Sequence, residues 1–219
     1  SYAELEREIE EIRKGTDKPF GVNLRADQPD ITKRIDLLIR EGVAVASFAL
    51  APRQDLIARC KDGGLVVMPS IGARRHAEKV AAWGADAVIV QGAEGGGHTG
   101  RVATSVLLPQ VVDATGIPVI AAGGFHDGRG LVAALAYGAA GIAMGTRFLL
   151  TSDSTVPDAV KQVYLGTPVT GTVVSTRVDG VPHRVLRTPL VERLESASAA
   201  SSLPRAVANA ARFRSISGL

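Results

Sequence analysis

Six short apolar runs recur along this chain, and they set the strongest limit on how it can fold. They lie at residues 18–25, 43–50, 65–71, 87–93, 117–124 and 141–148. Each run is apolar throughout rather than alternating, which is typical of parallel strands covered on both faces. Helical patterns separate them, at residues 30–42, 53–64, 73–85 and 128–140. Successive runs begin roughly 20 to 30 residues apart, which is the period of strand–helix units.

This order predicts an α/β fold, either a (β/α)₈ TIM-type barrel or a doubly wound sheet. We favour the barrel, because the candidate functional residues described below lie where strands lead into loops, which is where barrels carry their functional residues. A barrel needs eight strands, whereas six are recognisable here. Residues 1–20 form a helical pattern leading into a strand, so we expect the first two strands to precede Ser1.

The pattern changes after Phe148, and we predict two parts: a barrel portion at 1–150 and an appended cap or substrate segment at 151–219. The second part contains a short helical pattern, β-branched stretches with turn signals, and a small, polar, partly helical tail. We expect this segment to be less ordered than the barrel.

Composition excludes several classes of protein. The chain has 219 residues and a formal charge of +3, but its basic residues form no tract, so nucleic-acid binding is not indicated. No apolar run reaches the roughly 18 residues that span a bilayer, and no secretory signal is visible, which predicts a cytoplasmic protein without membrane contact. The single cysteine, Cys60, ends a helical pattern and is interpreted as a structural thiol.

Two consecutive strand ends carry glycine turns. Gly123 and Gly124 end one apolar run, and Gly145 and Thr146 lie in the second half of the next. Such turns let backbone N–H groups point at a phosphate, and many barrels build their phosphate site from the loops after their last two strands. The alternative is that these glycines only make tight turns.

A third strand end carries the sequence VIVQGAEGGGHTGR, in which one imidazole lies among glycines. Histidine exchanges protons near neutral pH, so His98 is our candidate acid/base. His76 lies on a solvated helix face, whereas His126 and His183 are weak candidates for substrate contact. No spacing of His, Cys or carboxylates predicts a metal site.

Asn23 and Gln91 end two strands with amides that can both donate and accept hydrogen bonds. A heteroaromatic ring such as an isoalloxazine or a pterin would use such groups. The alternative is that each amide caps local backbone.

Four motifs together resemble the nitronate monooxygenase (2-nitropropane dioxygenase) family of FMN-dependent barrels: DKPFGVN, GADAVIVQGAEGGGHTG, IPVIAAGGFHDGRG and GAAGIAMGTRFLLTSDS. The resemblance covers roughly the first 155 residues in the right order. The same superfamily includes FMN-dependent enoyl-acyl-carrier-protein reductases. The later part is most similar to an actinobacterial branch associated with breakdown of the steroid C and D rings, which acts on coenzyme A thioesters.

The resemblance implies roles for individual residues. His98 matches the catalytic histidine, and Ser70 stands where some members carry a lysine facing the flavin. The family's first strand, with its Gln-x-x-Met element, is not found in this chain. The resemblance also implies contacts with FMN: the phosphate at Gly123, Gly124, Gly145 and Thr146, the ring and ribityl chain near Asn23 and Gln91, and close approach at Gly96 and Gly97.

The resemblance therefore implies an FMN-dependent oxidoreductase acting on an activated carbonyl compound or ring-bearing acyl-CoA in steroid catabolism. Alternatives are oxidation of alkyl nitronates with O₂, reduction of an enoyl thioester, and a flavin- or phosphate-binding protein without turnover. NAD(P)H is a candidate transient electron donor, and a homo-oligomer stays open. Candidate partners for CoA phosphates are Arg101, Arg129, Arg184 and Arg187.

Overall fold

A computed structural model of the chain describes residues 1–196. The tail predicted as partly helical, residues 197–219, lies outside the described residues.

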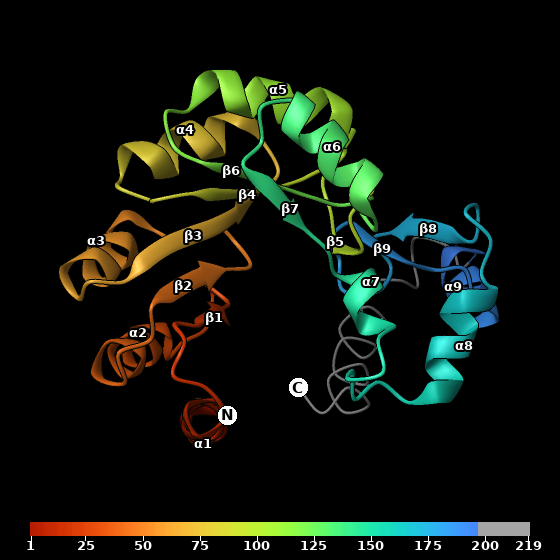
Figure 1. The fold of residues 1–219 in the computed structure, drawn as a ribbon. Helices are drawn as coiled ribbons and strands as arrows, with labels where there is room; N and C mark the ends of the chain where they lie inside the picture. Colours follow the sequence, from red (N-terminus) through yellow and green to blue (C-terminus); the bar gives the residue numbers. More distant parts are fainter. Residues whose placement is uncertain (197–219) are drawn as a thin grey trace.

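A six-stranded parallel sheet is the centre of the fold, with strand order β1-β2-β3-β4-β6-β7. Figure 1 shows this sheet curving through part of a circle, with helices on its convex side. The strands are β1 (Gly21–Leu24), β2 (Val45–Phe48), β3 (Val66–Ile71), β4 (Val88–Gln91), β6 (Val119–Ala122) and β7 (Gly141–Ala143). The helices are α1 (Tyr2–Gly15), α2 (Ile31–Arg40), α3 (Gln54–Asp62), α4 (Arg74–Ala82), α5 (Thr104–Ala114) and α6 (Gly128–Ala136). All six predicted strands are confirmed, and the curved sheet is part of a (β/α) barrel.

The two faces of this sheet are buried to different extents. Val88 and Val90 on β4 are fully buried beneath the helices, whereas Ile89 and Gln91 between and after them are only partly buried. The same alternation runs through β3 and β6. We expected both faces of the strands to be covered. The helices cover the convex face, whereas the concave face is only partly buried and carries polar residues.

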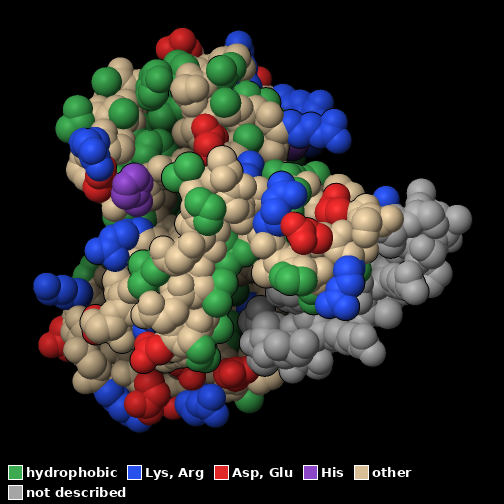
Figure 2. All heavy atoms as spheres, turned by 90° about the vertical axis from the view of Figure 1, so that its right-hand side faces the viewer, with side chains coloured by type: hydrophobic (Ala, Val, Ile, Leu, Met, Phe, Trp, Pro, Cys, Tyr) green, Lys and Arg blue, Asp and Glu red, His purple; other side chains and the backbone are tan. Residues whose placement is uncertain are grey.

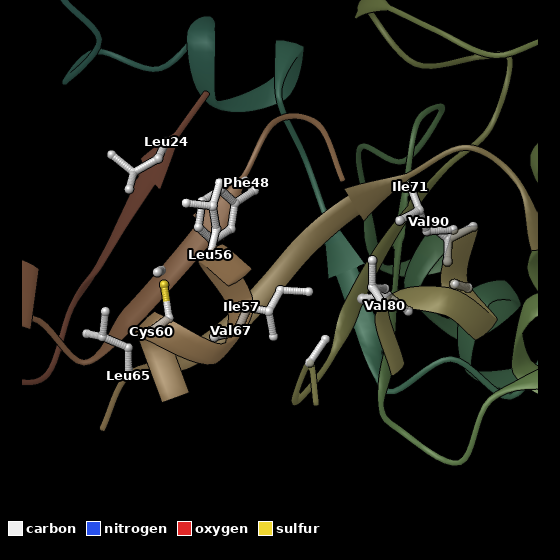
Figure 3. Close-up of a cluster of buried hydrophobic side chains, with 14 of the residues drawn as sticks. Leu24, Phe48, Leu56, Ile57, Cys60, Leu65, Val67, Ile71, Val80 and Val90 are labelled. Carbon is white, nitrogen blue, oxygen red and sulfur yellow. The ribbon is translucent and has the colours of Figure 1, made fainter. Parts of the chain in front are cut away.

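The core lies between the sheet and its helices (Figure 3). Leu56, Ile57 and Cys60 of α3 pack there with Phe48 of β2 and Val67 of β3. Each large apolar side chain buried in this way contributes roughly 1.5–3 kcal/mol. Burial raises the pKa of the Cys60 thiol to about 11, which supports the interpretation of Cys60 as a structural thiol.

A second, three-stranded sheet has the order β5-β9-β8, and the sequence patterns did not reveal it. β5 (Gly97–His98) belongs to the glycine loop after β4, whereas β8 (Thr172–Ser175) and β9 (His183–Leu186) belong to the C-terminal segment. Helix α7 (Thr146–Leu149) follows β7, and helices α8 (Asp158–Gly166) and α9 (Pro189–Ser196) lie in the C-terminal segment. The boundary near residue 150 stays a prediction, but strands from both sides of it pair with each other.

Apolar side chains remain exposed on α6 and just after it. Figure 2 shows hydrophobic side chains gathered on the upper part of one face, at the height of α5 and α6 in Figure 1. Leu131, Val132 and Leu135 of α6 and Tyr137, which follows α6, are exposed. Homo-oligomerisation stays a prediction.

Within residues 1–196, no helix combines the length and apolar character needed to cross a bilayer.

Candidate active site

Three glycine-containing turns meet at the carboxyl ends of β4, β6 and β7. A Cβ atom added to Gly123, after β6, would lie 2.7 Å from the backbone nitrogen of Gly95, after β4. A Cβ atom on Gly96 would lie 3.6 Å from Oγ1 of Thr146, after β7. The backbones approach so closely at the first contact that no side chain fits there. The fold thus brings the predicted phosphate turns and the glycine loop together.

Gly123 and Gly124 both have left-handed backbone conformations, with φ of 94° and 82°. Residues with a Cβ atom rarely adopt such angles. Glycine is therefore required at this strand end both by the conformation of the turn and by the closeness of the neighbouring loop.

Gln91 holds the glycine loop in place. Its Nε2 donates to the carbonyl oxygen of His98 at 2.7 Å, and the carbonyl oxygen of Gly96 lies 3.4 Å away. Capping of local backbone, which was one of the two alternatives for this amide, is what these contacts show for its N–H groups. Contact with a flavin stays a prediction.

Asn23 and Ser70 lie on the concave face of the sheet. Asn23 pairs in register with Ser47, and Ser47 pairs with Met68, two residues before Ser70 on β3. The Ser47 hydroxyl donates to Oδ1 of Asn23 at 2.9 Å. This bond fixes the orientation of the Asn23 amide, whose Nδ2 group makes no hydrogen bond to another residue in the described part of the chain.

His98 lies on β5, with 45% of its side chain exposed, and it has two partners from the C-terminal segment. Its Nε2 is 2.6 Å from Oδ2 of Asp179. Its ring centroid is 4.4 Å from that of His183, which pairs with it across the strands β5 and β9. The candidate acid/base is thus held by residues that are far away in the sequence.

The charges around His98 are set by burial and hydrogen bonding. Burial raises the pKa of Asp179, but the Val181 N–H and the two histidines lower it more, so its pKa is below the ordinary value. Burial is also the main reason why the pKa of His183 is lowered. At neutral pH this arrangement places a carboxylate and a neutral imidazole beside His98.

Arg184, next to His183 on β9, braces the glycine loop. Its Nε and Nη2 donate to the carbonyl oxygen of Ala93 at 3.1 and 2.9 Å, and its Nη1 donates to Oγ1 of Thr172 at 2.8 Å. These contacts occupy the guanidinium that was a candidate partner for CoA phosphates.

The remaining candidates lie at the surface. The guanidinium of Arg129 donates to Asp127, the residue that caps α6, and the exposed His126 has Nε2 3.6 Å from the same carboxylate. Arg101 and Arg187 are exposed. No further role follows from these positions.

The sequence patterns missed Asp179 and the clustering of His183 with His98. One nitrogen or oxygen from each of the three residues lies within 4.8 Å of the others, an arrangement able to hold a metal ion. The expectation of no metal site therefore stays a prediction. The signal available in the sequence was the Asp179–Gly180 pair between two β-branched stretches, which is typical of a hairpin turn.

Comparison with known proteins gives a consistent family. A model described as nitronate monooxygenase matches residues 30–216. The chain is 69% identical to the (3aS,4S,5R,7aS)-5-hydroxy-7a-methyl-1-oxo-octahydro-1H-indene-4-carboxyl-CoA dehydrogenase of Mycobacterium tuberculosis, over 98% of this chain and 61% of the relative.

Two solved structures share the fold. FabK from Thermotoga maritima matches with a TM-score of 0.89 and 38% identity, over 94% of this chain and 66% of FabK. Nitroalkane oxidase from Streptomyces ansochromogenes matches with a TM-score of 0.83 and 28% identity, over 100% of this chain and 76% of that enzyme. The chain thus spans about two thirds of the length of FabK and 61% of the length of the mycobacterial dehydrogenase. By the extent of the family match and by these identities, the chain belongs to the nitronate monooxygenase family.

Proposed function

We propose that this protein is an FMN-dependent oxidoreductase that acts on a ring-bearing acyl-CoA thioester in the breakdown of steroid rings. The substrate class is supported by the 69% identity to a dehydrogenase named for an indene-carboxyl-CoA. The chemistry is supported by the histidine and the glycine turns at one end of the sheet.

The observation that carries the proposal is the convergence of three glycine turns beside His98. The contact of Gly95 with Gly123 and that of Gly96 with Thr146 leave backbone, rather than side chains, at the carboxyl ends of β4, β6 and β7. Backbone exposed at strand ends suits an anionic ligand that needs N–H donors. The residues present therefore fit a bound flavin phosphate.

Each group of residues at this site is then assigned to a different portion of the flavin cofactor. When bound, a flavin supplies the two-electron redox chemistry. We assign its phosphate to the turns after β6 and β7. We assign its polar ring and ribityl atoms to the amides of Asn23 and Gln91, and its close backbone neighbours to Gly96 and Gly97. The phosphate turns are formed by Gly123, Gly124, Gly145 and Thr146.

His98 supplies the proton chemistry. A neutral imidazole can remove a proton from the carbon next to the thioester carbonyl, and an imidazolium can return it. Because 45% of the His98 side chain is exposed, a substrate can reach the ring. The carboxylate of Asp179 stabilises the positive charge that the ring acquires.

Nitronate oxidation is the second candidate function. It is favoured by the family match and by the structural similarity to a nitroalkane oxidase. In that case His98 would position the small anion or assist its deprotonation. An enoyl-thioester reductase would use the same proton chemistry in the reverse direction.

The decisive experiment is an anaerobic one on purified protein with its bound flavin. The protein is mixed separately with NADH, NADPH, an alkyl nitronate and a hydroxylated ring-bearing CoA ester, and the flavin absorbance is followed. Bleaching by the CoA ester supports the proposed dehydrogenase, and bleaching by the nitronate supports the second candidate. Bleaching by a nicotinamide indicates a reductase, which is then tested with enoyl-CoA acceptors. A protein that binds flavin but reacts with none of these would contradict an enzymatic role.

A further inference from the structure

The cluster formed by His98, Asp179 and His183 contains a buried polar atom without a partner. Nδ1 of His183 is buried and makes no hydrogen bond within the described residues, yet it lies 3.7 Å from Oδ2 of Asp179. The same Oδ2 is 2.6 Å from Nε2 of His98. One carboxylate oxygen therefore faces a ring nitrogen of both histidines.

The backbone around Asp179 fixes where this carboxylate points. Its other oxygen, Oδ1, accepts from the N–H of Val181 at 3.1 Å, and Gly180 has a left-handed conformation with φ of 91°. The N–H of Gly180 donates to the carbonyl oxygen of Thr176 at 3.0 Å. The turn before β9 thus presents Oδ2 alone to the histidines.

The backbone of His98 is fixed as firmly. Antiparallel pairing joins it to His183, the N–H of Thr99 donates to the carbonyl oxygen of Pro182 at 3.0 Å, and Gln91 Nε2 donates to the carbonyl oxygen of His98. The tilted ring of His183 packs against the His98 ring at 42°. Both partners in the 2.6 Å contact are therefore held by further hydrogen bonds, unlike most pairs at a surface.

The charge on Asp179 decides which nitrogen of His98 carries the proton. A carboxylate accepts and does not donate, so the His98 nitrogen that faces it must be N–H. In the neutral ring the lone pair is then on Nδ1. Arg25, just after β1, also interacts with this carboxylate: its pKa is raised chiefly by Asp27 and to a smaller extent by Asp179.

We propose that Asp179 is the positioning residue of His98: it holds the imidazole in the Nε2–H tautomer and makes Nδ1 the nitrogen that exchanges a proton with substrate. This inference rests on the proposed function, in which His98 is the acid/base. Asp179, a residue of the C-terminal segment, thereby contributes to catalysis through His98.

Two kinds of measurement on the flavin-loaded enzyme test this assignment. The first is ¹⁵N NMR of the histidine rings, with the His98 signals identified from their loss in His98→Ala. An Nε2–H signal for His98 in the unmodified enzyme is expected, and an Nδ1–H signal overturns the proposal. This readout needs no activity and no variant of Asp179.

The second measurement is steady-state kinetics of Asp179→Asn and Asp179→Glu, with Glu192→Gln as the control for loss of an exposed acid in the same segment. Loss of an orienting partner commonly costs on the order of 10- to 100-fold in rate. We expect kcat of Asp179→Asn to fall by that amount, with KM and flavin content little changed and partial recovery in Asp179→Glu. An unchanged kcat in Asp179→Asn overturns the positioning role.

The outcomes separate this proposal from the proposed function. If His98→Ala is inactive while Asp179→Asn keeps full kcat and the Nε2–H signal, only the positioning role fails. If His98→Ala keeps its activity, the acid/base assignment fails and Nδ1 has no proton to exchange. If a chelator removes a bound divalent metal and the activity together, and Asp179→Asn does not bind that metal, Asp179 is a metal ligand and the proposal is wrong.

Discussion

Glu94 accepts two hydrogen bonds from Thr104, one from its backbone N–H at 2.9 Å and one from its hydroxyl at 2.7 Å. Glu94 lies in the glycine loop after β4, and Thr104 is the first residue of α5. The pair therefore ties the loop that carries His98 to the start of the next helix.

This pair makes a pH-dependent contribution to stability. Burial raises the pKa of Glu94, but the two hydrogen bonds from Thr104, with smaller contributions from the Glu94 backbone and Arg184, together lower it more, so its pKa is below the ordinary value of 4.5. The stabilisation is thus complete above that value and is lost as the pH falls through the lower, folded-state pKa. We expect Glu94→Gln to unfold at lower urea concentration than the unmodified protein at pH 7, with the difference shrinking towards pH 3. A difference independent of pH would contradict this.

Arg184→Gln removes the brace between β9 and the glycine loop. Hydrogen bonds from charged donors contribute about 1.5–3 kcal/mol, so we expect a decrease of this size in the free energy of unfolding. Arg187→Gln is the control, since Arg187 is exposed and directly follows the end of β9. Urea titrations measure both. Equal stability of the two variants would show that the Arg184 contacts contribute little.

Gly123→Ala introduces strain where the glycine turns meet. A residue with a Cβ atom at a φ of 94° costs roughly 1–2 kcal/mol, and this Cβ also meets the Gly95 nitrogen at 2.7 Å. We expect lower thermal stability together with weaker flavin binding, measured by fluorescence titration. Gly116→Ala is the matched control, because a Cβ there meets nothing within 4 Å. Normal flavin affinity in Gly123→Ala would show that this turn does not contribute to flavin binding.

In the unmodified protein, Oδ1 of Asn23 accepts a hydrogen bond from the Ser47 hydroxyl. Ser47→Ala removes this bond and leaves the Asn23 amide free to rotate. One neutral hydrogen bond is worth about 0.5–1.5 kcal/mol, so we expect flavin affinity to fall by roughly 2- to 10-fold. Fluorescence titration measures this change. Ser47→Thr is the control, because threonine keeps the hydroxyl and is compatible with a β-strand, and we expect it to retain most of the affinity. An unaltered affinity in Ser47→Ala would show that the amide orientation does not matter for the cofactor.

His98→Ala separates catalysis from cofactor binding. We expect the flavin content to survive while turnover per flavin falls by roughly 10² or more, the usual contribution of a general acid/base. His76→Ala, on the exposed face of α4, serves as the control. A His98→Ala protein that lost its flavin but kept its activity per flavin would contradict the catalytic assignment.

The parallel strands and the glycine turns were predictable, because apolar runs and glycine pairs are local signals. α5 was not recognised as a helix, since Pro109 interrupts its pattern. The partners of His98 were not predictable either. β5 has only two residues, and it forms because β9 supplies backbone partners from a distant part of the chain. No periodicity in either segment indicates the other.

The same long-range pairing determines when the site can form during synthesis of the chain. His98 and Asp179 are 81 residues apart in sequence, and Arg184 lies 91 residues beyond the loop carbonyl that it holds. The parallel strands and their helices can assemble from neighbouring segments, whereas bringing such distant residues together costs loop-closure entropy that only the finished contacts repay. A nascent chain released before β9 would therefore have its sheet but not its ordered histidine. The hydrogen-bonded arrangement of His98 therefore depends on residues that are synthesised after all six parallel strands.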